Sequence, residues 1–110
     1  MITAIVLYDL PKEIDRAACE AHFLKIAPGF LDAPGFVRKQ FIYSVEGGVA
    51  GGSYIWETLE DAKRFYSGPW IDGIRARYGN EPRVTYFETL AIADAATGYA
   101  GAPRLPARVD

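Results

Sequence analysis

The sequence has few residues that bind metals or form disulfides. It contains one cysteine, Cys19, and one histidine, His22, among 110 residues. A single cysteine cannot form a disulfide within the chain, and this pair provides none of the spaced clusters that hold zinc or an iron–sulfur centre. The sequence therefore predicts a fold that is stabilised without a structural metal and without internal disulfides.

The chain also lacks an excess of basic residues and any long apolar run. Its 12 Lys and Arg against 14 Asp and Glu give a formal net charge of -2, with no basic stripe of the kind that binds phosphate backbones. No apolar stretch approaches the length needed to cross a bilayer, and the first residues do not have the pattern of a secretory signal. We therefore expect a cytoplasmic protein that binds neither nucleic acid nor membrane.

Half of the residues are hydrophobic, which is ample for one buried core in a chain of this length. The spacing of apolar residues and the positions of Pro and Gly predict the elements in order. These are a strand over 2–8, a helix from residue 15, two strands over 36–45 and 53–57, a helix over 59–67, a short helix over 69–78 and a strand over 83–93. Thr58, three residues before Asp61, is typical of a helix start.

This order of elements, βαββαβ, predicts the ferredoxin-like α+β fold, in which a four-stranded antiparallel sheet carries its helices on one face. We expect one domain over residues 1–94, followed by a tail over 95–110 that is either disordered or packed on a partner. The first strand is apolar on both faces, with Ala4, Val6 and Tyr8 on one side and Ile5 and Leu7 on the other.

The second apolar sheet face needs a cover, because the helices can bury only one face. Burying a medium-sized apolar side chain is worth about 1.5 to 3 kcal/mol, so an exposed apolar face favours pairing with an identical sheet. The predicted strand over 83–93 shows the same two-faced pattern, with Val84, Tyr86 and Leu90 opposite Phe87 and Ala91. The sequence therefore predicts a homodimer formed through the sheet face.

A small aromatic ligand would then lie between each sheet and its own helices. At the break between the second and third helices, Trp70 is placed to stack on a ligand beside Tyr66, and Arg64 to stabilise a developing oxyanion, so these three are the candidate catalytic residues. The candidate substrate-binding residues are Tyr8, Phe23, Tyr54, Trp56 and Tyr86. Each ring is equally compatible with core packing, and Arg64 with a solvated position near Glu60.

His22 and Cys19 are predicted to lie outside the site. His22 shares a helical face with Asp15 and Lys25, so we expect it to face solvent. Cys19 falls on the apolar stripe of the same helix, where a thiol is buried and inert. Neither residue is predicted to bind a metal.

Three segments are informative together: residues 34–36 with Lys39 downstream, residues 50–52 with Tyr54 and Trp56, and the predicted helix over 58–66. With them, about residues 1–93 resemble the YdhR-type mono-oxygenase family of the dimeric α/β-barrel superfamily. This resemblance implies a dimer and a cofactor-independent oxidation, in which a phenolic substrate loses a proton and its carbanion reduces dioxygen. Haem-degrading relatives carry an Asn on the first strand, where this chain has Leu7 and Tyr8.

The function expected from these features is a cofactor-independent mono-oxygenase that acts on a small aromatic or polycyclic phenol. Two alternatives remain open at this stage. The pocket of the same fold could belong to a dimer that binds a small molecule without turnover, or to an isomerase or cyclase, because one fold hosts many activities.

Overall fold

The structure, a computed structural model, describes residues 1–104 of the chain. The elements in order are β1 (Ile2–Asp9), α1 (Arg16–Ile26), the 3-10 helix η1 (Ala27–Phe30), β2 (Phe36–Tyr43), β3 (Val49–Trp56), α2 (Leu59–Phe65), α3 (Pro69–Tyr78), β4 (Arg83–Glu88), β5 (Ile92–Asp94) and β6 (Tyr99–Gly101). Within the described residues, no helix combines the length and the apolar character that crossing a membrane requires.

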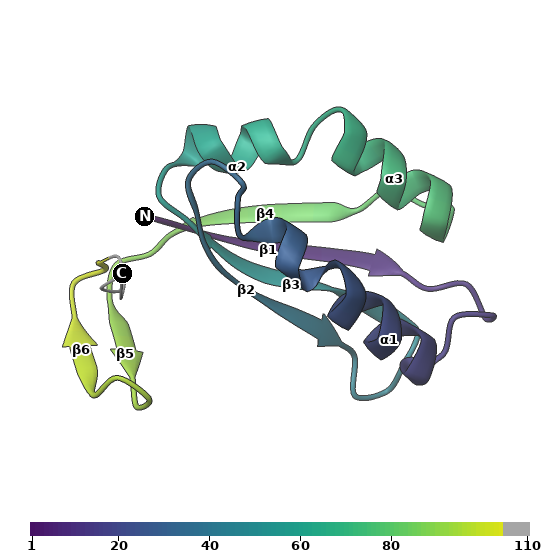
Figure 1. Cartoon of the computed structure of the whole chain (residues 1–110), viewed down its shortest axis with the longest axis horizontal. Helices are drawn as coiled ribbons and strands as arrows, with labels where there is room; N and C mark the ends of the chain where they lie inside the picture. The colour runs from purple at the N-terminus through teal and green to yellow at the C-terminus, as the bar shows by residue number, and fades with distance from the viewer. Residues whose placement is uncertain (105–110) are drawn as a thin grey trace.

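Strands β1 to β4 form one antiparallel sheet in the order β2-β3-β1-β4. Helices α1, α2 and α3 pack against this sheet, on the face that carries Ala4, Val6 and Tyr8 (Figure 1). The prediction of a ferredoxin-like α+β fold is confirmed. Strand β3 begins at Val49, four residues before the predicted start, because its three small residues over 50–52 pair with β1 and β2 although they lack a strand-like apolar pattern.

The helix starts follow from local side-chain chemistry. The side chain of Asp15 accepts a hydrogen bond from the backbone N–H of Ala18 at 2.9 Å, and Thr58 accepts one from the N–H of Asp61 at 3.1 Å. Both side chains satisfy N–H groups that have no partner in the first turn of a helix. Helix α3 ends at Gly79, which adopts φ 75° at its C-terminal cap.

The C-terminal part of the chain differs from the sequence prediction. The strand expected over 83–93 ends at Glu88, and Leu90, predicted to pack on a sheet face, is 79% exposed between elements. Residues 92–101 form a hairpin of β5 and β6 that projects from one end of the sheet (Figure 1). The expected tail thus contains regular structure up to residue 101, and its last residues, 105–110, lie outside the described residues.

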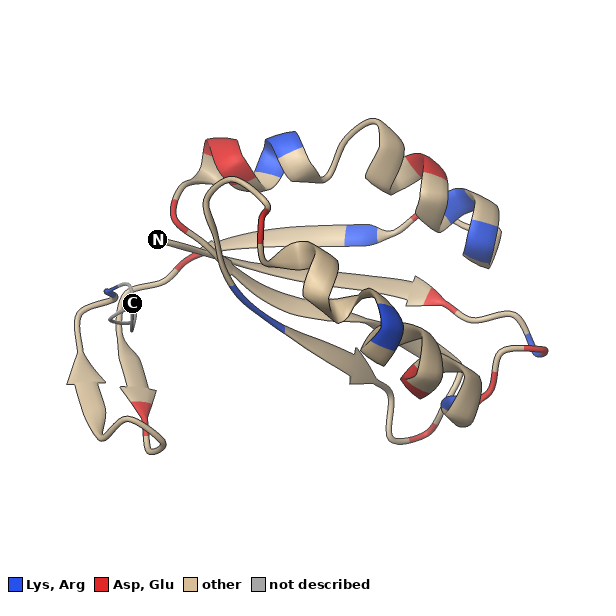
Figure 2. Cartoon of the chain, viewed as in Figure 1, with Lys and Arg blue, Asp and Glu red and all other residues tan. Residues whose placement is uncertain are grey.

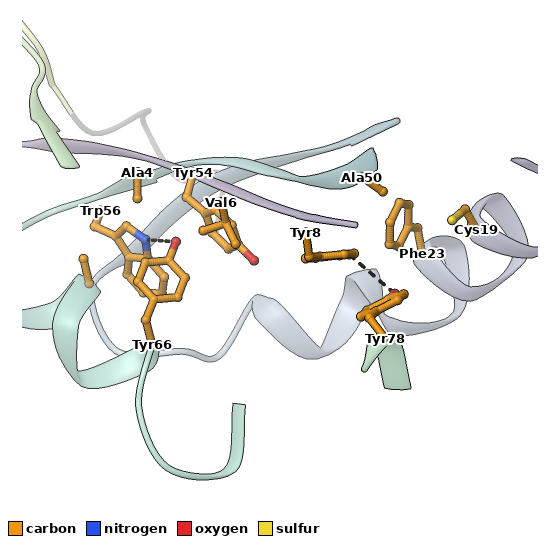
Figure 3. Close-up of a cluster of buried hydrophobic side chains, with 11 residues drawn as sticks. Ala4, Val6, Tyr8, Cys19, Phe23, Ala50, Tyr54, Trp56, Tyr66 and Tyr78 are labelled. Atoms are coloured by element: carbon orange, nitrogen blue, oxygen red, sulfur yellow. Dashed lines mark hydrogen bonds between the residues drawn. The ribbon is translucent and has the colours of Figure 1, made fainter. Parts of the chain in front are cut away.

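The core between sheet and helices is built largely from Tyr and Trp side chains (Figure 3). Tyr54 and Trp56 are almost completely buried, and Trp56 Nε1 donates a hydrogen bond to Tyr66 Oη at 3.0 Å. The Tyr8 ring stacks on Tyr78 with 4.1 Å between centroids. Large aromatic side chains bury much apolar area while their polar atoms keep partners, which suits a small domain.

The opposite face of the sheet is apolar only in part, because Thr3, Gln40, Ser53 and Thr85 share it with apolar residues. It carries Ile5, Leu7, Ile42, Ile55 and Phe87. None of these five side chains is fully buried, and Phe87 is 52% exposed. Pairing with a second copy through this face remains a prediction.

Candidate functional site

A cavity of about 330 Å³ lies between the sheet and helices α1 and α3. Residues from β1, β2, β3, α1, η1 and α3 contribute to its wall, so it exists only when the sheet and both helices are in place. Its lining combines apolar and aromatic side chains with a small number of polar groups, which is typical of small-molecule sites. The charged or polar groups in its wall are Tyr8, His22, Lys39, Tyr54, Arg77 and Tyr78.

A β-bulge turns Lys39 into this cavity. In the pairing of β2 with β3, Phe36 lies opposite Trp56, but Arg38 lies opposite Ile55, so β2 contains one extra residue at this point. Side chains alternate between the faces of a strand, and an extra residue reverses the alternation. Lys39, opposite the inward-facing Tyr54, therefore points toward the helices.

The Lys39 ammonium group lies among aromatic rings. Its Nζ is 3.6 Å from the ring centroid of Phe41, 4.0 Å from that of Phe30 and 4.5 Å from that of Tyr54. Among the described residues, no carboxylate lies within salt-bridge distance of this amine. Burial lowers the pKa of Lys39 to about 7, because an ammonium loses hydration that no carboxylate replaces.

The tyrosine hydroxyls of the cavity are hydrogen-bond donors. Tyr8 Oη donates to Tyr78 Oη at 3.4 Å, and Arg77 Nε donates to the same Tyr78 oxygen at 3.3 Å. Burial raises the pKa of Tyr8 and of Tyr54 well above the usual tyrosine value, so both phenols stay protonated at neutral pH. They can orient a ligand oxygen but cannot remove its proton.

The expectation that His22 faces solvent is wrong. His22 is half-buried and lines the cavity. It follows Cys19 by three positions and precedes Ile26 by four, which places it at the edge of the apolar stripe as well as near Lys25. Burial, and then the positive charges of Arg77 and nearby lysines, lower the pKa of His22, so its imidazole is neutral at pH 7.

Three of the predicted site residues meet in the cavity, namely Tyr8, Tyr54 and Trp70. Trp56 and Tyr66 instead form a buried hydrogen-bonded pair at the other end of the core (Figure 3). Tyr66 lies next to Trp70 with 4.9 Å between ring centroids, so it supports the cavity wall from behind.

The other predicted residues lie outside the cavity wall. Arg64 is exposed and pairs with Asp61 at 3.1 Å, on the outer side of the break between α2 and α3. Phe23 is buried, packs on Phe41, and also lines an outer groove between α1 and β2. Tyr86 is half-buried on β4, 6.2 Å from the Tyr66 ring. The Arg64 side chain is thus solvated, as in the alternative to a catalytic role that the sequence allowed.

Lys39 and Arg77 were not identified as site residues from the sequence. A lysine between Arg38 and Gln40 has the pattern of an exposed edge strand, and only the bulge reverses its direction. Figure 2 shows the adjacent basic residues of β2 in blue, and further basic residues near the end of α3. The wall of the cavity contains Lys39, Arg77 and His22 but no Asp or Glu. Among residues 1–104, no cluster of three or more His, Cys, Asp or Glu side chains is placed to hold a metal ion.

No protein-family model matches the chain, and no curated protein is similar to it in sequence. Solved structures do share its fold. A Deinococcus radiodurans protein named as a candidate antibiotic biosynthesis monooxygenase is 14% identical with a TM-score of 0.66, over 86% of this chain and 97% of that chain. The heme-degrader MhuD from Mycobacterium tuberculosis is 20% identical with a TM-score of 0.65, over 86% and 100%.

SnoaB, a cofactor-independent oxygenase from Streptomyces nogalater, is 18% identical with a TM-score of 0.59, over 80% of this chain and 91% of that chain. At such identities the likeness shows the fold. The chain has the same α+β fold as these oxygenases, and the match covers nearly the whole length of each neighbour.

Proposed function

We propose that this protein is a cofactor-independent mono-oxygenase that oxidises a small aromatic or polycyclic phenol with dioxygen, in the manner of the YdhR-type family. The observation that carries the proposal is the cavity of about 330 Å³ between sheet and helices, which is lined by rings and by basic and hydroxyl groups. Its volume is at the lower end of the range for small-molecule sites, which suits a compact ring system.

The chemistry needs a base, donors for an oxyanion and a site shielded from water. For an anthrone, a base takes a proton from the ring CH2 group, and the carbanion transfers one electron to dioxygen. The radical and superoxide then combine through a new C–O bond. The peroxide takes back the proton and loses water, so that one anthrone and one dioxygen give one anthraquinone and one water. Tyr54 lines the cavity and would donate its hydroxyl to the substrate oxygen, and Tyr8 would do so on releasing its hydrogen bond to Tyr78.

A neighbouring structure and the lining of the cavity support the proposal. SnoaB, which shares the fold, is named as a cofactor-independent oxygenase. The cavity also offers aromatic surfaces beside hydrogen-bond donors, which a flat substrate with one ionisable oxygen requires.

The test is oxygen uptake and quinone formation by the purified protein with anthrone in air. We expect turnover above the rate in buffer, and a loss of at least tenfold in Trp70→Ala, since Trp70 forms part of the cavity wall. Lys63→Ala, on the exposed side of α2, is the matched control and should retain the rate. No turnover across a panel of phenols would refute the proposal. Binding without oxygen uptake would indicate a binding protein, and a product isomeric with its substrate an isomerase or cyclase.

Haem is a second candidate ligand, because His22 lines the cavity and the neighbour MhuD is named as a heme-degrader. A neutral imidazole binds haem iron, so His22 would be the residue that holds the group. Titration with haem tests this candidate: a sharp Soret band that His22→Gln removes would support it. A spectrum unchanged from free haem would exclude it.

We also propose a homodimer formed through the sheet face opposite the helices, with the β5–β6 hairpin contacting the second copy. Ile5, Leu7, Ile42, Ile55 and Phe87 supply the apolar surface, and the hairpin projects beyond the sheet (Figure 1). We expect sedimentation at micromolar concentration to show a dimer that Ile5→Lys weakens, because a buried unpaired ammonium is costly. A wild-type monomer would refute the pairing.

A further inference from the structure

We infer that the Lys39 amine is the proton acceptor of the cavity. It takes the proton from the aromatic substrate, and the ammonium that forms then binds the substrate anion. This inference rests on the proposed oxidation and assigns its base to one residue. The β-bulge directs Lys39 into the cavity beside Tyr54, and Trp70 lines the same cavity, so a ligand packed on Trp70 lies near the Lys39 amine.

The surroundings of Lys39 favour a neutral amine before the reaction. Its side chain is largely enclosed by rings, and no carboxylate in the described part of the chain pairs with it. The lowered pKa, about 7, means that a large fraction of Lys39 carries a free lone pair at neutral pH. A lysine with an ordinary pKa would be protonated and could not accept a proton.

After proton transfer, the ammonium gains an anionic partner that the neutral amine did not need. The ring faces of Phe30, Phe41 and Tyr54 lie 3.6–4.5 Å from Nζ, a distance at which aromatic rings attract a cation. The new substrate anion adds an opposite charge that was absent before the transfer. Proton transfer therefore creates a charge pair, in which the new anion and the ring faces offset the burial that otherwise disfavours the ammonium.

The other titratable groups of the cavity are poorer bases. The titratable or charged groups that face Lys39 from the neighbouring elements are Tyr8, His22, Tyr54, Arg77 and Tyr78. The raised pKa values of Tyr8 and Tyr54 keep both phenols protonated, and a guanidinium does not deprotonate in proteins. His22 is the one competing base, and burial together with the nearby positive charges lowers its pKa, which makes it a weaker base than an ordinary histidine.

The experiment compares the pH dependence of kcat/KM in the wild type, Lys39→Met, Lys39→Arg and His22→Gln with anthrone as the substrate. We expect kcat/KM of the wild type to rise with pH through a midpoint near 7, because the neutral amine is the active form. Lys39→Met and Lys39→Arg should lose about 100-fold or more in kcat, the usual contribution of a positioned base. Arginine keeps the positive charge, so its failure separates proton transfer from charge alone.

Three controls complete the test. Lys63→Met, the same substitution on an exposed helix face, should leave the profile unchanged. His22→Gln should keep the midpoint near 7, whatever its rate, and methylamine should restore turnover to Lys39→Ala. A readout that needs no activity is the 13Cε shift of Lys39, which should titrate near 7 and be missing in Lys39→Met.

The outcomes separate the two claims. Wild-type turnover that survives both Lys39 substitutions with the same pH profile overturns the assignment of Lys39 and leaves the oxygenase standing. A 13Cε midpoint near the ordinary lysine value also overturns the assignment. No turnover by the wild type overturns the proposed function, and the role of Lys39 in it falls as well.

Discussion

Gly52→Ala is expected to displace the Lys39 side chain, although the substitution neither adds nor removes a charged group. Gly52 lies on the helix-facing side of β3, between Phe41 on β2 and Val6 on β1. A Cβ atom at this position would lie 2.5 Å from Lys39 Cε and 2.8 Å from Tyr54 Cε1. The absence of a side chain at residue 52 therefore makes the space that Lys39 occupies.

The size of the effect follows from these distances. Ordinary contact begins at 3.4 Å, so the Lys39 side chain must move by about 0.9 Å, and the buried Tyr54 ring must also shift. Overpacking a core costs about 1–3 kcal/mol, of which a Gly-to-Ala change recovers about 0.4–1 kcal/mol by restricting the unfolded chain. A displacement of about 1 Å at a reacting group can lower turnover 100-fold. We expect the unfolding free energy to fall by about 1–2 kcal/mol and kcat by about 10- to 100-fold.

Urea denaturation and steady-state oxygen uptake measure the two effects in the same preparation. Gly29→Ala is the matched control: a Cβ at Gly29 meets nothing within 4 Å, so kcat should be unchanged and the unfolding free energy should rise by about 0.4–1 kcal/mol. If Gly52→Ala keeps wild-type kcat and wild-type stability, then the inward placement of Lys39 and the space argument behind it are refuted.

Three further predictions concern stability. Tyr66→Phe removes the acceptor of the buried Trp56 indole N–H and should cost about 1–3 kcal/mol in urea denaturation, whereas an unchanged midpoint would contradict that hydrogen bond. Thr58→Ala removes the N-terminal cap of α2 and should cost about 1 kcal/mol, while Thr58→Ser, which keeps the hydroxyl, should restore most of it. The lowered pKa of Lys39 means that the unfolded chain binds more protons between about pH 7 and 10.5, so unfolding free energy should rise with pH across this window, by about 1.4 kcal/mol for each unit of lowering. Lys39→Met should abolish that rise, and a rise of equal size in the variant would refute the burial of the ammonium.

Much of the fold was predictable because its determinants are local. The apolar spacing around Cys19 and Phe23, the cap at Thr58 and the proline that opens α3 each act within a few residues, and each element appears where these signals place it. The early start of β3 and the β5–β6 hairpin were missed, because small residues pair in a sheet without an apolar pattern of their own.

The candidate site was predictable only in part. Tyr8, Tyr54 and Trp70 line the cavity as expected, since each faces the helices from a strand or lies at the break before α3. The sequence prediction put His22 on the solvent side of α1. Position 22 lies at the border of the apolar stripe, where a small rotation of the helix about its axis decides whether a side chain faces solvent or the cavity. Arg64 does not line this cavity but a separate hollow at the break between α2 and α3, which it shares with Trp70.

The periodicity of neighbouring residues alone predicts the βαββαβ order of the main sheet and its helices, the ferredoxin-like arrangement and the apolar residues on both faces of β1. Only the tertiary structure decided that Lys39 enters the cavity, because its direction depends on how β2 pairs with β3. One extra residue at the bulge reverses which side chains face inward. The chemistry available to the cavity therefore depends on strand register, which no single segment of the sequence encodes.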